Sequence, residues 1–145
     1  MSHRLGPDAG LSQATEVFKA VAHPARLRIL GMLRPGALCV CQITAVLDLS
    51  VSTVSAHLAE LKRAGLVVEQ KDGRWVNYSL AGGPAPRALL GRVRALVGGD
   101  PQVEADARLV RGLRRIPVED LCRVDLDLAR LGLRRQVPRP PGRNV

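Results

Sequence analysis

The sequence predicts a mainly α-helical protein that carries one small β-hairpin. Apolar residues recur at three- and four-residue steps in the first half of the chain, which is the spacing of a buried helix face. Two β-rich runs, 66–70 and 74–80, then flank Asp72-Gly73, and Asp-Gly is a strong signal for a tight hairpin turn. Aromatic residues make up only 2% of the chain, so leucine, valine and alanine must fill the core. Helices followed directly by a basic hairpin are typical of a winged helix-turn-helix.

The first three predicted helices span 12–22, 24–33 and 38–47, and breaks that contain proline or glycine separate them. His23 precedes the second helix, where it is expected to cap or pack. Pro24 suits the first turn of that helix, because its missing N–H would have no partner there.

The stretch 47–66 is the one around which the other elements are organised. Ser50 or Ser52 can cap a helix there, because a hydroxyl at that position accepts a bond from a free backbone N–H, and Gly65 ends the helix. Its predicted buried face consists of Val51, Val54, Leu58 and Leu61. The opposite face is small or polar, so it can approach DNA closely while its hydroxyls bond phosphates and bases. With the basic wing, the predicted DNA contacts are Ser50, Ser52, Thr53, Ser55, His57, Lys62, Arg63, Lys71 and Arg74.

The second half of the chain predicts further helices. A Gly/Pro hinge at 82–86 precedes a helix over 88–97, whose broad apolar stripe needs a covering surface, and a second subunit is the simplest one. A further helix is expected over 103–116, and the stretch 118–133 is amphipathic. The candidate anchors of that stretch are Leu121, Val124, Leu128 and Leu131. We therefore divide the chain into a flexible tail (1–10), a DNA-binding and dimerisation domain (11–98), a helical extension (99–136) and a disordered tail (137–145).

Composition narrows the class of partner. The chain has 145 residues, a formal charge of +9 and a pI of about 10.9, which favours a polyanionic partner such as nucleic acid or a membrane surface. No apolar run is long enough to span a bilayer, and the start lacks an apolar signal region, so we expect a cytoplasmic protein with reduced thiols. No Cys-x-x-Cys motif, phosphate-binding loop or carboxylate pair supports an enzyme, and no organic cofactor is expected.

Several blocks resemble the ArsR/SmtB family of metal-sensing repressors. Residues 18–30, FKAVAHPARLRIL, resemble the family's FKALAHPTRLRIL, and residues 38–43, LCVCQI, resemble the ELCVCDL metalloid box of its arsenic-responsive branch. Residues 49–58, LSVSTVSAHL, resemble LSQSTVSRHL, and residues 64–67 and 73–78 match the family's AGLV and GRWVYY wing. The resemblance covers about half of the chain. It implies a homodimeric winged helix-turn-helix repressor that leaves its operator DNA when a metal or metalloid binds.

Three positions depart from the family's pattern. Val51 stands where the family often has Gln, and Ala56 where it often has Arg, and each change removes a possible DNA contact. Thr44 stands where the arsenic branch has its usual third cysteine.

Cys39 and Cys41 are the candidate ligands, because thiolates prefer soft, thiophilic partners. In a continuous helix, positions i and i+2 point about 200° apart, so joint binding requires an extended backbone or a distorted first turn. The helix they begin is expected to pack against the reading helix, so ligand and operator would bias one element in opposite directions.

Trivalent arsenic and antimony, the expected inducers, take three sulfurs. Cys122 is the candidate third ligand, from the same subunit or its partner; the alternative is a buried, apolar role beside Leu121. A small cellular thiol or solvent is a further way to complete the site.

Two alternatives to metalloid sensing are a transition-metal site and a redox switch. Residues 81–97 contain no His, Cys, Asp or Glu, so a transition-metal site on that helix has no ligands. The runner-up function is a winged-helix repressor in which Cys39 and Cys41 form a thiol redox switch.

Overall fold

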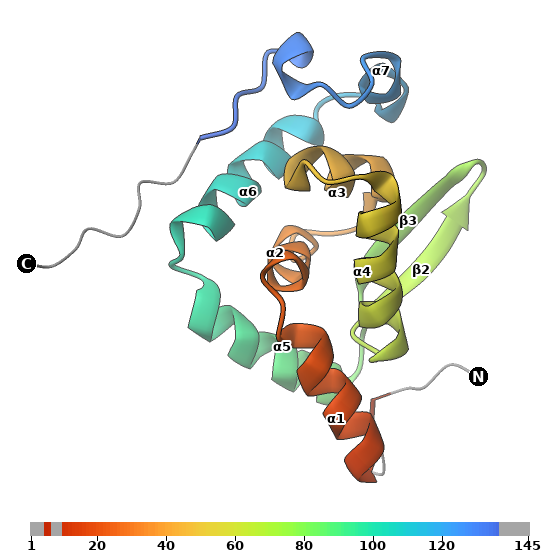
Figure 1. Cartoon of the computed structure of the whole chain (residues 1–145), viewed down its shortest axis with the longest axis vertical. Helices are drawn as coiled ribbons and strands as arrows, with labels where there is room; N and C mark the ends of the chain where they lie inside the picture. The colour runs from red at the N-terminus through yellow and green to blue at the C-terminus, as the bar shows by residue number, and fades with distance from the viewer. Residues whose placement is uncertain (1–4, 7–9, 137–145) are drawn as a thin grey trace, which may run out of the picture.

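The computed structural model describes residues 5–6 and 10–136, which form an assembly of helices with a small sheet at one side (Figure 1). The predicted tail at 137–145 lies outside the described residues, as does most of the predicted tail at 1–10. The predicted mainly helical winged helix-turn-helix is confirmed.

The chain enters through two helices joined at a short break. Helix α1 spans Gly10–Val21 and α2 spans Pro24–Met32. His23 caps α2, because its Nδ1 accepts a hydrogen bond from the backbone N–H of Ala25 at 3.1 Å. Proline occupies the first helical position, as predicted.

The helix-turn-helix consists of α3 (Val40–Leu47) and α4 (Val51–Arg63). Asp48 ends α3 in the left-handed conformation, with a φ of 57°. Ser50 then caps α4, since its Oγ accepts from the N–H of Thr53 at 3.2 Å. Gly65, with a φ of 78°, ends the helix as predicted.

The predicted start of the third helix at Leu38 is wrong by two residues. Leu38 and Cys39 form a short strand, β1, which pairs antiparallel with Tyr78 and Asn77 of β3. The pairing completes a three-stranded sheet and buries both β1 side chains, at 1% and 2% exposure. This partner lies far along the chain, so the local apolar spacing does not reveal it.

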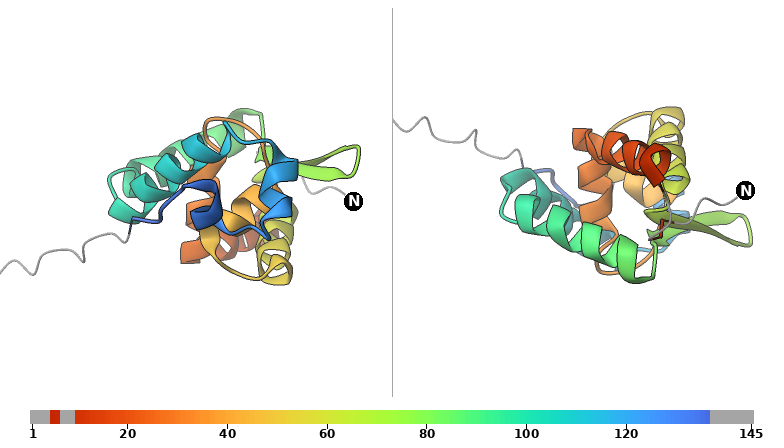
Figure 2. Two further views of the ribbon diagram at one scale, coloured as in Figure 1. Left: turned by 90° about the horizontal axis from the view of Figure 1, so that it is seen from above. Right: turned by 90° about the horizontal axis from the view of Figure 1, so that it is seen from below.

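The predicted hairpin is present as β2 (Val67–Asp72) and β3 (Trp75–Leu80), and it projects away from the helices (Figure 2). Gly73, with a φ of 59°, turns the chain at its tip. Near its base, the hydroxyl of Tyr78 donates to Glu69 Oε2 at 2.9 Å. Burial, followed by this bond, raises the pKa of Tyr78 to about 12.

Helices α5 (Pro84–Val97) and α6 (Pro101–Leu113) follow the wing, and α5 begins earlier than the predicted residue 88. The amphipathic stretch at 118–133 forms two short helices in place of one continuous helix. Helix α7 covers only Val118–Arg123, and a 3-10 helix, η1, covers Leu128–Leu131. Two consecutive positive φ angles, 52° at Asp125 and 61° at Leu126, break the helix between them. Among the described residues, every helix is too short or too polar to cross a bilayer.

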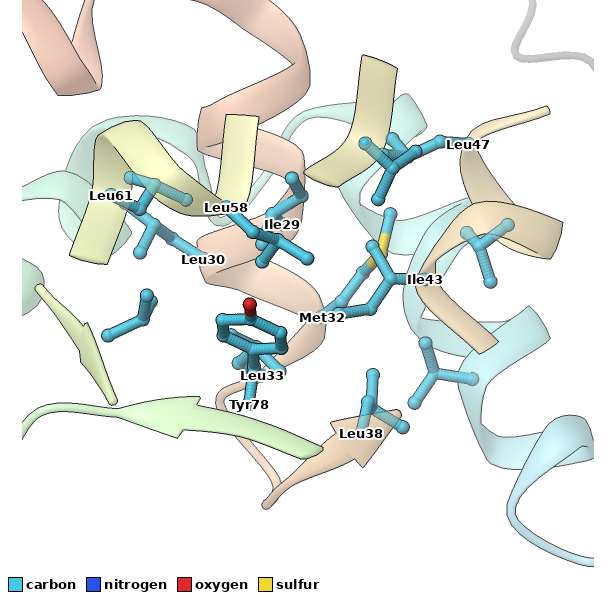
Figure 3. Packing of buried hydrophobic residues seen from close by; sticks show 14 of the residues in the cluster. Ile29, Leu30, Met32, Leu33, Leu38, Ile43, Leu47, Leu58, Leu61 and Tyr78 are labelled. Carbon is cyan, nitrogen blue, oxygen red and sulfur yellow. The ribbon is translucent and has the colours of Figure 1, made fainter. Parts of the chain in front are cut away.

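The core lies where α2, α3, α4 and the sheet meet (Figure 3). Val54, Leu58 and Leu61 of α4 are fully buried there, as predicted. The prediction for Val51 is wrong, because its side chain is 53% exposed at the first turn, beyond the edge of the core.

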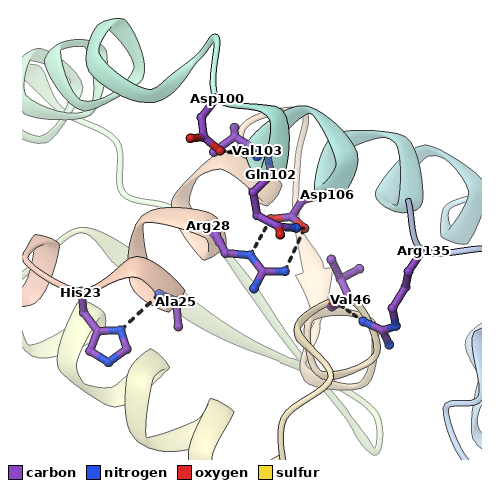
Figure 4. Close-up of polar contacts among 9 residues, drawn as sticks. All are labelled: His23, Ala25, Arg28, Val46, Asp100, Gln102, Val103, Asp106 and Arg135. Atoms are coloured by element: carbon purple, nitrogen blue, oxygen red, sulfur yellow. Dashed lines mark hydrogen bonds and ion pairs between the residues drawn. The ribbon is translucent and has the colours of Figure 1, made fainter. Parts of the chain in front are cut away.

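The C-terminal extension covers a face of α2 and α3 (Figure 1). Leu109, Val110 and Leu113 of α6 join the same core. Arg28 of α2 forms a two-pronged ion pair with the buried Asp106 of α6, with distances of 2.8 and 3.0 Å (Figure 4). An acid that is only 2% exposed needs such a partner, so this pair fixes α6 on α2.

Of the candidate anchors in the extension, Leu121 and Leu128 are buried as predicted. Val124 and Leu131 are only half-buried, because the break between α7 and η1 turns the chain away from one helix face.

Candidate thiol site and DNA-binding face

Cys39 sits at the junction between β1 and α3. It is the N-cap of α3, in an extended conformation with φ of −80° and ψ of 160°. Because Cys39 is not helical, the 200° separation expected within a continuous helix does not apply to Cys39 and Cys41. Burial raises the pKa of the Cys39 thiol, and hydrogen bonds from the backbones of Gln42 and Cys41 partly offset this effect.

The Gln42 side chain holds this junction in place. Its Oε1 accepts from the backbone N–H of Cys39 at 2.9 Å, the reach-back half of a capping box. Sequence reasoning missed Gln42, although its place three residues after the N-cap is the signal for such a box.

Cys41 and Cys122 lie together, although they are far apart in the sequence. Their Sγ atoms are 3.8 Å apart, one on α3 and one on α7, within a single chain. Burial, then the hydrogen bond with Cys122 and the nearby Cys39, raise the pKa of Cys41 to about 12. All three cysteines are free thiols. The C-terminal extension places the sulfur of Cys122 beside Cys41, near the start of α3.

The described residues contain no group of three or more His, Cys, Asp or Glu side chains already arranged to hold a metal ion. The thiols meet at Cys41, which contacts Cys122 and lies near Cys39.

Thr44, which stands in place of the arsenic branch's third cysteine, is buried at 4% exposure. Its Oγ1 has no hydrogen-bond partner among the described residues. A buried hydroxyl without a partner costs free energy, so packing alone does not account for this side chain.

The small, polar face of α4 is open. Ser52, Thr53 and Ser55 are exposed, and the hydroxyl of Ser50 lies 2.8 Å from that of Thr53. A cap hydroxyl and exposed hydroxyls in the first turn of a helix are groups that bond phosphate oxygens.

His57 lies farther along α4 and has partners within the protein. Its Nδ1 accepts from Arg26 Nε at 3.2 Å, and its ring centre is 4.4 Å from that of His23. Burial, then the charges of His23 and Arg26, lower the pKa of His57. The ring is therefore a neutral link between α2 and α4, and its role as a DNA contact stays a prediction.

The predicted basic contacts are exposed on α4 and the wing. Lys62 pairs with Glu69 at 3.4 Å, and Arg63 with Glu60 at 2.8 Å, both at the surface, where such pairs are weak. At the wing tip, Lys71 is exposed and the Arg74 guanidinium lies 5.1 Å from the centre of the Trp75 ring. Surface pairs of this kind can be exchanged for phosphates at little cost.

The helix-turn-helix is similar to known regulators in sequence. Residues 23–68 match the profile described as "bacterial regulatory protein, arsR family". The arsenic resistance transcriptional regulator of Pseudomonas putida is 45% identical over 65 residues, which are 44% of this chain and 51% of that protein. The arsenical resistance operon repressor of Escherichia coli is 42% identical over 67 residues, 46% of this chain and 57% of that protein. The chain thus spans about half the length of these two relatives.

A third relative is covered more fully. It is an uncharacterized HTH-type transcriptional regulator of Methanocaldococcus jannaschii, 45% identical over 67 residues, which are 46% of this chain and 75% of that protein.

Solved structures give the same fold. HlyU from Vibrio cholerae superposes with a TM-score of 0.53 at 36% identity, covering 59% of this chain and 91% of that one. A homodimeric winged helix-turn-helix DNA-binding domain from Mycobacterium bovis, a possible ArsR-family regulator, gives 0.56 at 32% identity, covering 68% and 91%. The family profile ends at residue 68, so Cys122 lies outside the part of the chain that it matches.

Proposed function

The chain belongs to the arsR family of bacterial regulatory proteins, and from this we propose that it is a homodimeric transcriptional repressor of double-stranded operator DNA, released by arsenite or antimonite. The observation that best supports a metalloid inducer is the contact between the sulfurs of Cys41 and Cys122, which are 3.8 Å apart near the start of α3. The proposal includes no catalytic activity.

The donor set suits a trivalent metalloid. Arsenous acid carries three hydroxyl groups, and three thiols displace them as three waters while forming three arsenic–sulfur bonds. We assign the thiols to Cys39, Cys41 and Cys122 of one chain. Each thiol proton leaves in a water molecule, so the reaction is balanced without an oxidant or a free base.

The site lies where it can act on DNA binding. Cys39 caps α3 and Cys41 is in its first turn, while α3 packs on α4. Drawing three sulfurs around one atom changes the start of α3, and α4 shares the core with it. If the metalloid binds one arrangement of α3 and α4 more tightly and DNA binds the other, each ligand weakens the binding of the other.

The thiols of Cys39 and Cys41 support the alternative, a redox switch, less well. The nucleophile in thiol oxidation is the thiolate, and burial raises the pKa of both Cys39 and Cys41. The sulfur–sulfur contact at 3.8 Å joins Cys41 to Cys122, whereas the redox switch pairs Cys41 with Cys39. Mass spectrometry after mild peroxide treatment separates the two functions, because only the redox switch needs oxidised cysteine for release.

The DNA-binding surface combines α4 and the wing. The relatives' names, which include an arsenical resistance operon repressor, and the homodimeric DNA-binding neighbour support this assignment. We assign DNA contact to the exposed residues Ser52, Thr53, Ser55, Lys71 and Arg74, with Ser50, His57, Lys62 and Arg63 beside them.

The second subunit is assigned to the exposed apolar residues of α1 and α5. Leu11 and Phe18 of α1 are 86% and 65% exposed, and Leu96 of α5 is 85% exposed; large apolar side chains of this kind mark an interface. The predicted stripe on α5 is divided, because Val93 is buried within the chain while Leu96 faces outward.

Arsenite titration tests the thiol site directly. Sulfur–arsenic absorbance in wild type should saturate at one arsenite per chain, and Cys122→Ser should weaken binding at least tenfold. Thr44→Cys in the Cys122→Ser background should restore a three-thiol site on α3. Unchanged affinity in Cys122→Ser removes Cys122 from the site, and normal DNA release by a Cys39→Ser, Cys41→Ser double variant overturns the sensing function.

A further inference from the structure

Resting on the proposed function, we propose that Arg135 is a positioning residue that holds the carbonyl end of α3, so that the C-terminal extension controls this helix from both ends. The thiol contact acts at the first turn of α3. Arg135 acts at its last turn, where the chain enters the turn of the helix-turn-helix.

The last carbonyls of a helix lack partners within the helix, and Arg135 supplies them for α3. Its Nη1 donates to the carbonyl oxygen of Val46 at 2.7 Å (Figure 4). Its Nη2 donates to the carbonyl oxygen of Ala45. A cation at this end also matches the negative end of the helix dipole. The Asp48 carboxylate is 3.7 Å away, but it is 79% exposed, so the carbonyl bonds matter more.

The position of these bonds gives them their importance. Asp48 already strains the backbone into the left-handed region, and Ser50 starts the DNA-reading helix two residues later. The turn between α3 and α4 therefore depends on how the last turn of α3 is held. In the proposed function, the arrangement of α3 that Arg135 holds is the one that binds DNA.

The segment between Cys122 and Arg135 is anchored to the rest of the protein at Leu128 and Leu133. Leu128 is buried in the core, as is Leu121 just before the segment. Leu133 lies against Gly112 of α6 so closely that a β-carbon added there would meet its Cδ2 at 2.7 Å. Since the segment is short and anchored, a displacement of Cys122 toward the other thiols is transmitted to Arg135 and so to the turn.

The test compares Arg135→Gln with Arg134→Gln. Arg134 is adjacent and exposed, and it has no hydrogen bond or ion pair within the described part of the chain, so the control loses the same charge. The DNA is a duplex selected from a random library by the wild-type protein, and fluorescence anisotropy gives its affinity with and without arsenite. Sulfur–arsenic absorbance gives the arsenite affinity without DNA.

Arg135→Gln should bind DNA about tenfold more weakly than Arg134→Gln in the absence of arsenite. Its arsenite affinity without DNA should be unchanged or higher, so the ratio of DNA affinities with and without arsenite should fall. Arg135→Lys should restore part of the DNA affinity, because an ammonium group reaches one carbonyl but not two in fixed geometry.

Hydrogen exchange at residues 48–54 gives a readout that needs neither DNA nor arsenite. Arg135→Gln should exchange faster there than Arg134→Gln. Equal exchange and equal DNA affinity in the two variants would overturn the role of Arg135. If wild type takes up no arsenite, the proposed function fails instead, and the exchange comparison still decides the role of Arg135.

Discussion

The thiol of Cys41 departs far from the ordinary behaviour of a cysteine. Burial and its sulfur neighbours raise its pKa to about 12, so the folded protein holds this proton more tightly than the unfolded chain. Its contribution to stability is complete below the ordinary thiol pKa of 9.0 and is lost as the pH rises above it.

Alkylation by iodoacetamide should therefore be slow at Cys41 and keep rising with pH. Because the thiolate is the nucleophile, its rate in the folded protein should increase about tenfold per pH unit from pH 8 to 10. In guanidinium the same rate should level off above pH 9. Peptide mass spectrometry measures both rates, and a plateau near pH 9 in the folded protein would contradict the raised pKa.

Thr44 offers a substitution that should stabilise the protein. Thr44→Val replaces a buried hydroxyl that has no partner among the described residues with a methyl group of similar size. We expect the free energy of unfolding to rise by about 1 kcal/mol, measured by urea denaturation. Thr44→Ser keeps the hydroxyl and leaves a small cavity, so it should lower the free energy of unfolding by a similar amount.

At the scale of elements, His57 links α4 to α2 and makes this junction sensitive to acid. Its lowered pKa means that the folded protein disfavours the imidazolium. The link is therefore fully present above the ordinary histidine pKa of 6.5 and weakens as the pH falls below it.

The unfolding equilibrium constant should rise as the pH falls from 7 to 5, by no more than about tenfold per pH unit for this one group. His57→Gln should flatten that slope in urea denaturation at several pH values. His3→Gln, in the N-terminal segment, is the control and should leave the slope unchanged. An equal slope in wild type and His57→Gln would assign the acid sensitivity to other groups.

Much of the element order could be predicted from the sequence, because its signals are local. The caps at His23 and Ser50 and the Asp72-Gly73 turn act within a few residues of themselves. The errors have longer-range causes. Strand β1 exists because β3 pairs with it. The break after α7 depends on positive φ angles at Asp125 and Leu126, which are not glycines and so give no signal of a break in the sequence.

The candidate site divides in the same way. Cys39 and Cys41 follow from their spacing and from the family resemblance. The place of Cys122 beside them depends on how α7 folds back on α3, and no spacing in the sequence encodes that contact. Arg135 had no signal at all, since one arginine among 22 basic residues carries no mark of its target.

At the scale of the whole molecule, the exposed apolar residues of α1 and α5 should govern assembly. Leu96→Glu places a charge where an 85% exposed leucine would pack on a second subunit. We expect the protein to sediment as a monomer in analytical ultracentrifugation and to bind DNA at least tenfold more weakly. Ala129→Glu, at an exposed position on η1, should remain dimeric. A dimeric Leu96→Glu would move the interface elsewhere.

The contact between Cys41 and Cys122 also has a consequence for the unfolded chain. The two residues are 81 positions apart, so any ligand that joins them closes a large loop, as a reversible crosslink would. Loop-closure entropy sets the value of such a crosslink at about 4 to 5 kcal/mol where it persists on unfolding. Arsenite should therefore raise the melting temperature of wild type by several degrees and leave that of Cys122→Ser nearly unchanged. Calorimetry would then detect inducers of this protein without knowledge of its operator.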